Sequence, residues 1–324
     1  MNKQMVLSFL AGLVLPLALA AVFQQDVPVG DVESDALSET APTVPGDEAV
    51  ELTVKNHAGN LQQITLEDYL VGVVLAEMPA DFEIEALKAQ AVVARTYTRR
   101  RMAGGKHEGA AVCMDPGCCQ GYRSGEDYLR EGGRQSSVDK VRSAVEATDG
   151  LVLEYGGSLI DATYFSCSGG VTEDAVAVWG RDVPYLQSVQ SPGEEAAPRF
   201  RDTVSFSASE LAQRLGISPK GDPERWFGDV TRTQGDGVAR MEICGTDFTG
   251  TELRSKLGLR STAFEVAVNG KTVTFTTRGF GHRVGMSQYG AQAMAKEGST
   301  CAEILEHYYT GAELVGHPAA YYGN

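Results

Sequence analysis

The chain has 324 residues, of which 43% are hydrophobic and 22% are charged, with 37 Gly and 12 Pro. This usage is typical of a soluble globular protein and argues against the disordered, collagenous and multi-span membrane classes. The formal net charge is −15, from 28 Lys and Arg against 43 Asp and Glu. A nucleic-acid binder is therefore not expected, because phosphate contacts need clustered Lys and Arg.

Residues 1–24 are predicted to form a membrane anchor or a signal segment. Met5 to Phe23 is a run of 19 residues without a charge, which nearly spans a hydrocarbon core of roughly 30 Å. A cleaved signal peptide is the alternative, because small residues stand near the end of the run. The flanking Lys3 favours a cytoplasmic amino terminus in either case. We expect a single pass through the cell membrane, with the body on the extracytoplasmic side.

Residues 25–48 are predicted to form an acidic disordered linker. Between Asp26 and Glu51 there are eight acidic residues, three prolines and no Lys or Arg, a composition too charged and too poor in apolar residues to fold alone. About 275 residues follow, enough for one large domain or for two lobes that share a cleft. The expected catalytic lobe is 49–192 with 270–324, and the expected second lobe is 193–269.

The first predicted elements of the body are a hairpin and a helix. Residues 50–54 and 61–64 read as two short strands around a turn. Thr65 is a good N-cap for the helix that follows. This helix is expected to end near Glu77, because Pro79 pushes the residue before it out of the helical region.

The second helix, from about residue 83 to 101, is the strongest helix prediction, since apolar and small residues recur at helical spacing. The remaining predicted elements are a helix at 138–147, a hairpin of 151–155 with 159–164, a short helix within 206–217, strands at 229–233, 238–243, 264–268 and 272–277, and a final helix at 286–296. Strands cluster into hairpins and do not alternate with helices. The predicted fold class is therefore α+β, with mixed but largely antiparallel strands.

Four segments carry a resemblance to a known family. They are AEMP at 76–79 followed by ALKAQAVVARTY at 86–97, YFSCSGG at 164–170, LGLRST at 257–262 and GFGHRVGMSQYGA at 279–291. Together and in this order they closely resemble the stage II sporulation protein D and amidase-enhancer family, over about residues 52 to 309.

The resemblance implies an exported lytic transglycosylase that cuts MurNAc–GlcNAc bonds of peptidoglycan during sporulation and engulfment. Its substrate is a glycan strand whose stem peptides have been removed by a partner, a cell-wall amidase or endopeptidase of the engulfment complex. Glu77 is implied as the catalytic acid, in a glycan-binding cleft between two lobes. The residues expected to line this cleft are Lys88, Arg95, Tyr164, Ser166, His282, Ser287, Gln288 and Tyr289.

The chemistry of a lytic cut agrees with a single acid. One carboxylic acid protonates the glycosidic oxygen while the 6-hydroxyl of the sugar attacks the anomeric carbon, whereas ordinary glycosidases need a pair of carboxylates. The end of a helix and burial would both raise the pKa of Glu77. Lys88 and Arg95, if close, would lower it, and a surface acid at a helix end is the structural alternative for Glu77.

His282 stands in a glycine-rich turn that opens a helix, where backbone N–H groups and polar side chains could bind sugar hydroxyls. A histidine that only satisfies the turn is the alternative. The resemblance places a glycine where this chain has Arg283, which either adds a cation to the cleft or narrows it. Ser166 and Ser168 do not form a nucleophile elbow of the Gly-x-Ser-x-Gly kind, so their loop is read as cleft wall.

Four soft ligands lie within thirteen residues: His107, Cys113, Cys118 and Cys119. A Cys3His set predicts a structural tetrahedral zinc site with no open position for catalysis. Two adjacent cysteines on one ion are geometrically demanding, so Asp115 or water could replace either. A disulfide is the competing interpretation in an exported protein.

Two other functions remain open at this stage. A non-catalytic protein could bind glycan and activate a cell-wall amidase, in which case Glu77 would not be needed. A metal-dependent hydrolase could use the cysteine cluster, in which case chelation would remove activity without unfolding the protein.

Overall fold

The computed structural model describes residues 46–316. The predicted membrane segment and the linker up to residue 45 lie outside the described residues. Within residues 46–316, no helix is both long enough and apolar enough to cross a membrane. The linker prediction is wrong for its last residues, because Asp47–Ala49 form a 3-10 turn in which Asp47 is buried.

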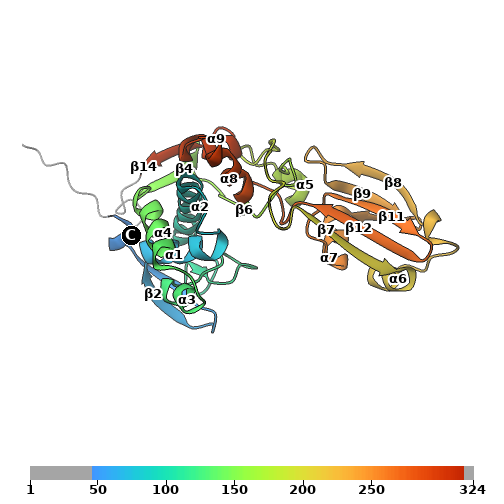
Figure 1. The fold of residues 1–324 in the computed structure, drawn as a ribbon, viewed down its shortest axis with the longest axis horizontal. Helices are drawn as coiled ribbons and strands as arrows, with labels where there is room; N and C mark the ends of the chain where they lie inside the picture. Colours follow the sequence, from blue (N-terminus) through green and yellow to red (C-terminus); the bar gives the residue numbers. More distant parts are fainter. Residues whose placement is uncertain (1–45, 317–324) are drawn as a thin grey trace, which may run out of the picture. The chain divides into compact units, whose positions relative to one another are not determined.

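The first hydrophobic core is built around helix α2 (Ile84–Ala103) (Figure 1). Its small residues allow close packing on all sides, and most positions from Ala86 to Arg99 are buried. Helix α1 begins after Thr65, whose side chain accepts a hydrogen bond from the Asp68 N–H, as the capping prediction requires. The helices of this core are α1 (Leu66–Glu77), α2, α3 (Gly125–Arg130), α4 (Gln135–Glu146), α5 (Ala175–Trp179), α8 (Gln288–Lys296) and α9 (Cys301–Tyr308).

Three small sheets accompany these helices. Their strand orders are β2–β1–β3, β14–β4–β5 and β13–β6. The strands are β1 (Glu51–Lys55), β2 (Leu61–Thr65), β3 (Val112–Cys113), β4 (Leu151–Tyr155), β5 (Ser158–Leu159), β6 (Tyr164–Phe165), β13 (Met286–Ser287) and β14 (Glu313–Gly316). The parallel pair β6–β13 joins two segments that are far apart in the sequence.

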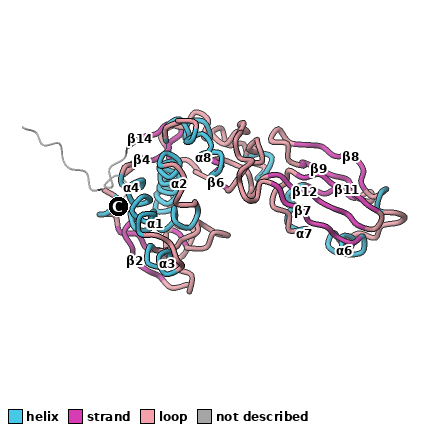
Figure 2. The backbone as a smooth tube through the Cα atoms, viewed as in Figure 1, coloured by secondary structure: helices cyan, strands magenta, loops and turns pink. Residues whose placement is uncertain are grey.

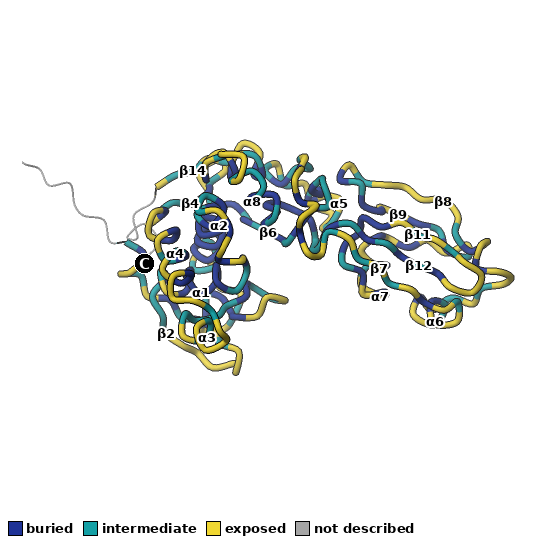
Figure 3. Tube along the Cα trace, viewed as in Figure 1, coloured by how far each residue is buried: buried dark blue, intermediate teal, exposed yellow. Residues whose placement is uncertain are grey.

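The second hydrophobic core contains two antiparallel sheets, with strand orders β10–β9–β8 and β11–β12–β7 (Figures 1 and 2). Phe206 and Phe264 both contact the ring of Phe275 in its interior. The elements are β7 (Arg201–Ser207), α6 (Ala208–Leu215), a 3-10 turn (Pro223–Arg225), β8 (Phe227–Arg232), β9 (Val238–Ile243), β10 (Thr246–Thr249), α7 (Gly250–Leu257), β11 (Phe264–Asn269) and β12 (Thr272–Arg278). Buried segments along β9, β11 and β12 are visible in Figure 3.

The α+β prediction is confirmed, and so are the first hairpin and the two helices that follow it. Three details differ from the predictions. The predicted hairpin of 151–155 with 159–164 forms as β4 with β5, but its second strand is shorter than expected, and Tyr164–Phe165 pair with β13 instead. Helix α9 follows the helix that was expected to be the last. The second core reaches past residue 269, since β12 pairs with both β11 and β7.

Candidate functional site

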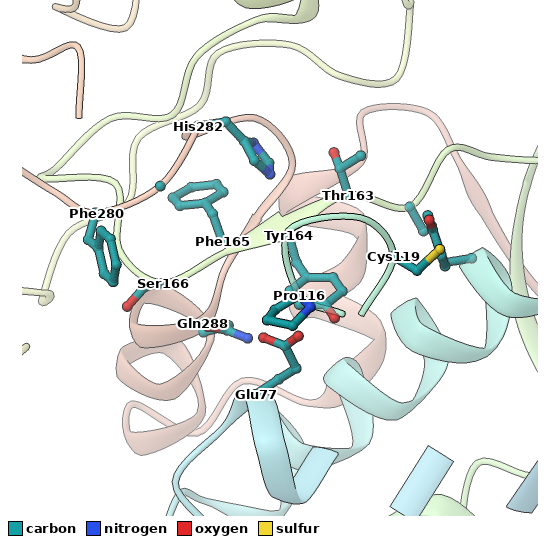
Figure 4. A pocket seen from close by; sticks show the side chains of 13 residues that line it. Glu77, Pro116, Cys119, Thr163, Tyr164, Phe165, Ser166, Phe280, His282 and Gln288 are labelled. Atoms are coloured by element: carbon teal, nitrogen blue, oxygen red, sulfur yellow. The ribbon is translucent and has the colours of Figure 1, made fainter. Parts of the chain in front are cut away.

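A pocket of about 480 Å³ opens beside the carboxyl end of α1. Figure 4 shows the side chains of Glu77 and Gln288 on one side of it and those of Phe165 and His282 on the other. The lining residues are Glu77, Tyr97, Pro116, Cys119, Ala162, Thr163, Tyr164, Phe165, Ser166, Phe280, Gly281, His282 and Gln288. The pocket thus unites the first, second and fourth segments of the family resemblance.

Glu77 is the last residue of α1, and its carboxyl group faces the pocket. Its Oε1 accepts a hydrogen bond from the backbone N–H of Gly121, at 2.6 Å. The side chains of Tyr164 and Gln288 also hydrogen-bond this carboxyl group. Burial raises the pKa of Glu77 above its usual value, and these hydrogen bonds only partly oppose the shift. The sequence left the direction of this shift open, since Lys88 and Arg95 would have lowered the pKa; in the structure burial is the main cause and raises it.

His282 forms the opposite wall of the pocket. Its ring lies 5.7 Å from the ring of Phe165 and 5.5 Å from that of Trp179, measured between centroids. Its Nδ1 accepts a hydrogen bond from the Val284 N–H, at 3.1 Å. Burial, helped by the charge of Arg254, lowers the pKa of His282 to about 4. The imidazole is therefore neutral at neutral pH and can donate only through its other nitrogen.

Two basic residues expected in the cleft do not line this pocket. Arg95 is fully buried, where its guanidinium pairs with Asp47 and its Nη2 donates to the Val145 carbonyl at 3.0 Å. Lys88 pairs with Glu85 on the surface of α2, at 2.7 Å. The placement of Arg95 differs from the expectation because its partner Asp47 lies in the acidic segment that was read as linker.

Two of the other expected residues also lie outside the lining. Ser287 is buried, caps α8 and donates a hydrogen bond to Glu194. Tyr289 packs edge-on against Phe82, with ring centroids 5.1 Å apart. Its backbone N–H donates to the Ser166 carbonyl at 3.0 Å, so it supports the loop that does line the pocket. Tyr164, Ser166, His282 and Gln288 are the expected substrate residues that the pocket brings together with Glu77.

The His/Cys cluster lies next to the same pocket, which Cys119 helps to line. Ligand atoms of His107, Cys113, Cys118 and Cys119 all lie within 4.8 Å of one another. A tetrahedral zinc with Zn–S of about 2.3 Å and Zn–N of about 2.0 Å needs donors at such short separations. All cysteines of residues 46–316 are free thiols, so the competing disulfide is not formed. The donor set therefore fits a metal ion.

The chain is similar to known proteins over most of its length. The SpoIID family model, described as stage II sporulation protein, matches residues 54–155. Stage II sporulation protein D of Bacillus subtilis (strain 168) is 40% identical over 95% of this chain and 94% of that protein. The chain belongs to the SpoIID family. The protein of the same name from Bacillus amyloliquefaciens is 38% identical over 93% of this chain and 92% of its own length.

SpoIID proteins are in turn related to an amidase enhancer. The amidase enhancer of Bacillus subtilis (strain 168) is 31% identical over 76% of this chain and 40% of the enhancer. The similarity therefore covers less than half of that larger protein. It links the SpoIID fold to a protein named for its effect on an amidase.

The family resemblance leads us to expect a glycine where this chain has Arg283, and the structure shows how the arginine is accommodated. Its φ is +68°, in the left-handed region that favours glycine. The side chain is 1% exposed and pairs with Glu173, while its nitrogens donate to the carbonyls of Ser168, Val171 and Gly235. Arg283 therefore neither adds a cation to the pocket nor narrows it.

Sequence reasoning missed Glu194, which binds the loop at Ser168 and Gly169, next to the pocket. Its carboxylate is 1% exposed and accepts hydrogen bonds from Ser168, Gly169, Ser191 and Ser287. A charge with this many donors holds the turn after Ser166 in place. The only sequence signal was an acid in a loop, which is normally exposed.

Proposed function

We propose that this SpoIID protein is a lytic transglycosylase that cleaves MurNAc–GlcNAc bonds in glycan strands without stem peptides, during sporulation and engulfment. The observation that supports this most is Glu77, a partly desolvated acid with a raised pKa at the base of a pocket lined by polar and aromatic groups. A group of this kind is typical of a general acid.

In the proposed reaction, protonated Glu77 donates its proton to the glycosidic oxygen, and the bond from that oxygen to the anomeric carbon of MurNAc breaks. The 6-hydroxyl of the same MurNAc forms the new bond to the anomeric carbon and releases its proton, which returns to the Glu77 carboxylate. No water is consumed, and the product carries a 1,6-anhydro end. The Gly121 N–H orients the carboxyl group throughout.

The other groups of the pocket bind the sugar in this proposal. Gln288 and the neutral His282 offer hydrogen-bonding atoms for hydroxyl and acetamide groups. Phe165 and Phe280 supply apolar faces against which a sugar ring can pack. Ser166 stands at the edge of the same surface.

We also propose that the His/Cys cluster holds a structural zinc ion. His107, Cys113, Cys118 and Cys119 together form a closed set of four ligands, so the ion leaves no position for substrate. Its role is to hold the loop between α2 and α3, which carries Gly121 and Pro116, against the pocket.

The proposal includes a location and a partner. Residues 1–24 would anchor the protein by a single membrane pass, with the body on the extracytoplasmic side. The relative named amidase enhancer supports a functional link to a cell-wall amidase, which would supply the strands that lack stem peptides.

Mass spectrometry of the products tests the proposal. The full chain is incubated in detergent with purified strands lacking stem peptides, alongside its Glu77→Gln variant. We expect 1,6-anhydro ends from the unmodified protein alone. Reducing ends would indicate a hydrolase. Strand binding and amidase stimulation without cleavage would instead favour the non-catalytic activator.

A further inference from the structure

Three guanidinium groups surround the segment 280–282 at one wall of the pocket. The Cζ atoms of Arg199 and Arg260 lie 5.2 Å and 5.0 Å from the centroid of the Phe280 ring. Arg254 is close enough to His282 to lower its pKa. Phe280 and His282 both line the pocket, and the three arginines adjoin these lining residues without lining the pocket themselves.

Arg254 is held in place by backbone groups. Its Nε donates to the Arg260 carbonyl at 3.3 Å, and the same carbonyl accepts the N–H of Gly281 at 3.1 Å. One carbonyl oxygen therefore joins the guanidinium of Arg254 to a residue of the pocket wall. Arg254 is half-buried, and burial lowers its pKa without any opposing acid.

Of Arg199, Arg254 and Arg260, only Arg260 has a carboxylate partner within the part of the chain that the structure describes. Arg260 pairs with Asp202, with Nε and Oδ2 3.1 Å apart. Among residues 46–316, no carboxylate forms an ion pair with Arg199 or Arg254. Most other arginines of the second core do have such partners, as in the pairs Arg240–Asp247 and Arg278–Asp236. Among the described residues, Arg254 is thus a partly desolvated cation without a counter-ion, which favours an anionic ligand, and the exposed Arg199 adds a second unpaired cation beside the Phe280 ring.

We propose that Arg254 and Arg199 form an anion subsite at the Phe280 end of the pocket, which binds a carboxylate of the glycan strand. This inference rests on the proposed function for the identity of the strand. The matching group is the lactyl carboxylate of MurNAc, because a guanidinium binds a carboxylate with two parallel N–H···O bonds.

The subsite explains a preference for strands without stem peptides. In a strand that carries its peptides, the lactyl group is bound as an amide and has no charge. Hydrolysis of that amide by an amidase consumes water and leaves a carboxylate on the sugar and an amine on the peptide. The partner reaction therefore creates the charge that Arg254 and Arg199 recognise.

Binding measurements on the full chain in detergent, in the Glu77→Gln background, test the subsite without cleavage. The two probes are fluorescently labelled strands lacking stem peptides and the same strands with their lactyl carboxylates converted to carboxamides. We expect the carboxamide strands to bind about tenfold more weakly, which is the effect of losing one charge-assisted contact. Adding Arg254→Gln or Arg199→Gln should weaken binding of the carboxylate strands and remove the difference between the probes.

Arg240→Gln is the matched control, since it removes the same charge from an exposed pair in the second core. It should preserve the difference between the two probes. Arg199 is exposed, so its variant reports on binding even where Arg254→Gln fails to fold. Equal binding of both probes, or binding of neither, would overturn the subsite. If the probes are discriminated in this way but the protein with Glu77 intact does not cleave the strands, the subsite stands and the transglycosylase is rejected.

Discussion

Arg283 and Glu173 form a buried ion pair, with Nη1 and Oε1 3.3 Å apart and each side chain 1% exposed. Glu173 also accepts a hydrogen bond from Thr233 at 2.9 Å, and Arg283 donates to the carbonyl of Gly235. The pair therefore connects the loop between β8 and β9 to the segment that follows Ser168. Its burial means that neither charge is compensated by solvent.

Arg283→Gly should destabilise the protein, although the family resemblance leads us to expect a glycine at this position. Loss of the partner leaves Glu173 buried and unpaired, which costs about 3–5 kcal/mol. Relief of the left-handed backbone returns about 1 kcal/mol. Urea unfolding should show a net loss, and Glu173→Gln in the same chain should recover part of it. A double variant less stable than Arg283→Gly would contradict this account.

Glu194→Gln should loosen the loop next to the pocket. An amide can accept hydrogen bonds at only one of its two polar atoms, so the donors Ser168 and Gly169 or Ser191 and Ser287 lose their acceptor. We expect a loss of about 3 kcal/mol and faster hydrogen exchange in one of two places. These are the amides of Ser168 and Gly169, if the new NH2 group faces them, or the amide of Gly290, which donates to Ser287, if it faces the serine hydroxyls. The exposed neighbour provides the control, since Glu195→Gln should leave both measurements unchanged.

The pH dependence of cleavage should follow Glu77 and His282. A general acid acts in its protonated form, so kcat/KM should fall as pH rises through the raised pKa of Glu77. At the acid side, activity should fall near pH 4, where His282 gains a proton. An alkaline limb at or below the ordinary pKa of 4.5 for a glutamate would contradict the role of Glu77.

Glu77 should also affect the stability of the folded protein. A folded-state pKa above the unfolded value means that the folded state binds more protons between the two values, so stability falls as pH rises through them. Glu77→Gln removes this loss. Its melting temperature should therefore exceed that of the unmodified protein near pH 7 and match it near pH 3.

Chelation should lower the stability of the protein and should have no direct effect on the cleavage step. If the His/Cys cluster holds structural zinc, removal of the ion should lower Tm by more than about 5 °C. Elemental analysis should find one zinc per chain, and Cys118→Ser should reduce this content. Chelated protein that keeps its Tm but loses cleavage would show that the metal takes part in the reaction.

Lys88→Ala and Arg95→Ala should separate a surface residue from a core residue on the same helix. Lys88 forms a partly exposed pair with Glu85, so its loss should change stability by less than about 1 kcal/mol. Arg95→Ala leaves Asp47 buried with one of its two arginine partners missing and should cost about 3 kcal/mol or more. Glycan binding by folded Lys88→Ala should be unchanged, and a large loss would return Lys88 to the substrate site.

The sequence was sufficient to predict the position of Glu77, because that position depends only on where a helix begins and ends. Thr65 and Pro79 set the ends of α1, and this was enough to place Glu77 at a helix end. The donor from Gly121 could not be predicted, because it comes from a loop 44 residues further along the chain. The roles assigned to Tyr164, Ser166, His282 and Gln288 remain predictions about a pocket that these residues do line.

The side chains of α2 show why helical spacing was insufficient to predict which residues line the pocket. Lys88 and Arg95 lie seven residues apart and were expected on one face, but α2 is covered on most of its circumference. Burial of Arg95 depends on Asp47, which sits in a segment whose composition indicates disorder. Acidic residues in such segments are normally exposed, but Asp47 is buried between Arg95 and Arg99. Only the tertiary structure reveals these two ion pairs.

The pairing of β6 with β13 has a consequence for how this architecture can vary. In the sequence, the strands of the second core all lie between β6 and β13. Its first strand, β7, pairs with its last, β12, so that Arg201 lies opposite Arg278. An insertion whose two ends meet can be exchanged, enlarged or shortened as one module. Evolution can then change which glycan strands bind, through Arg254 and its neighbours in this module, without moving Glu77.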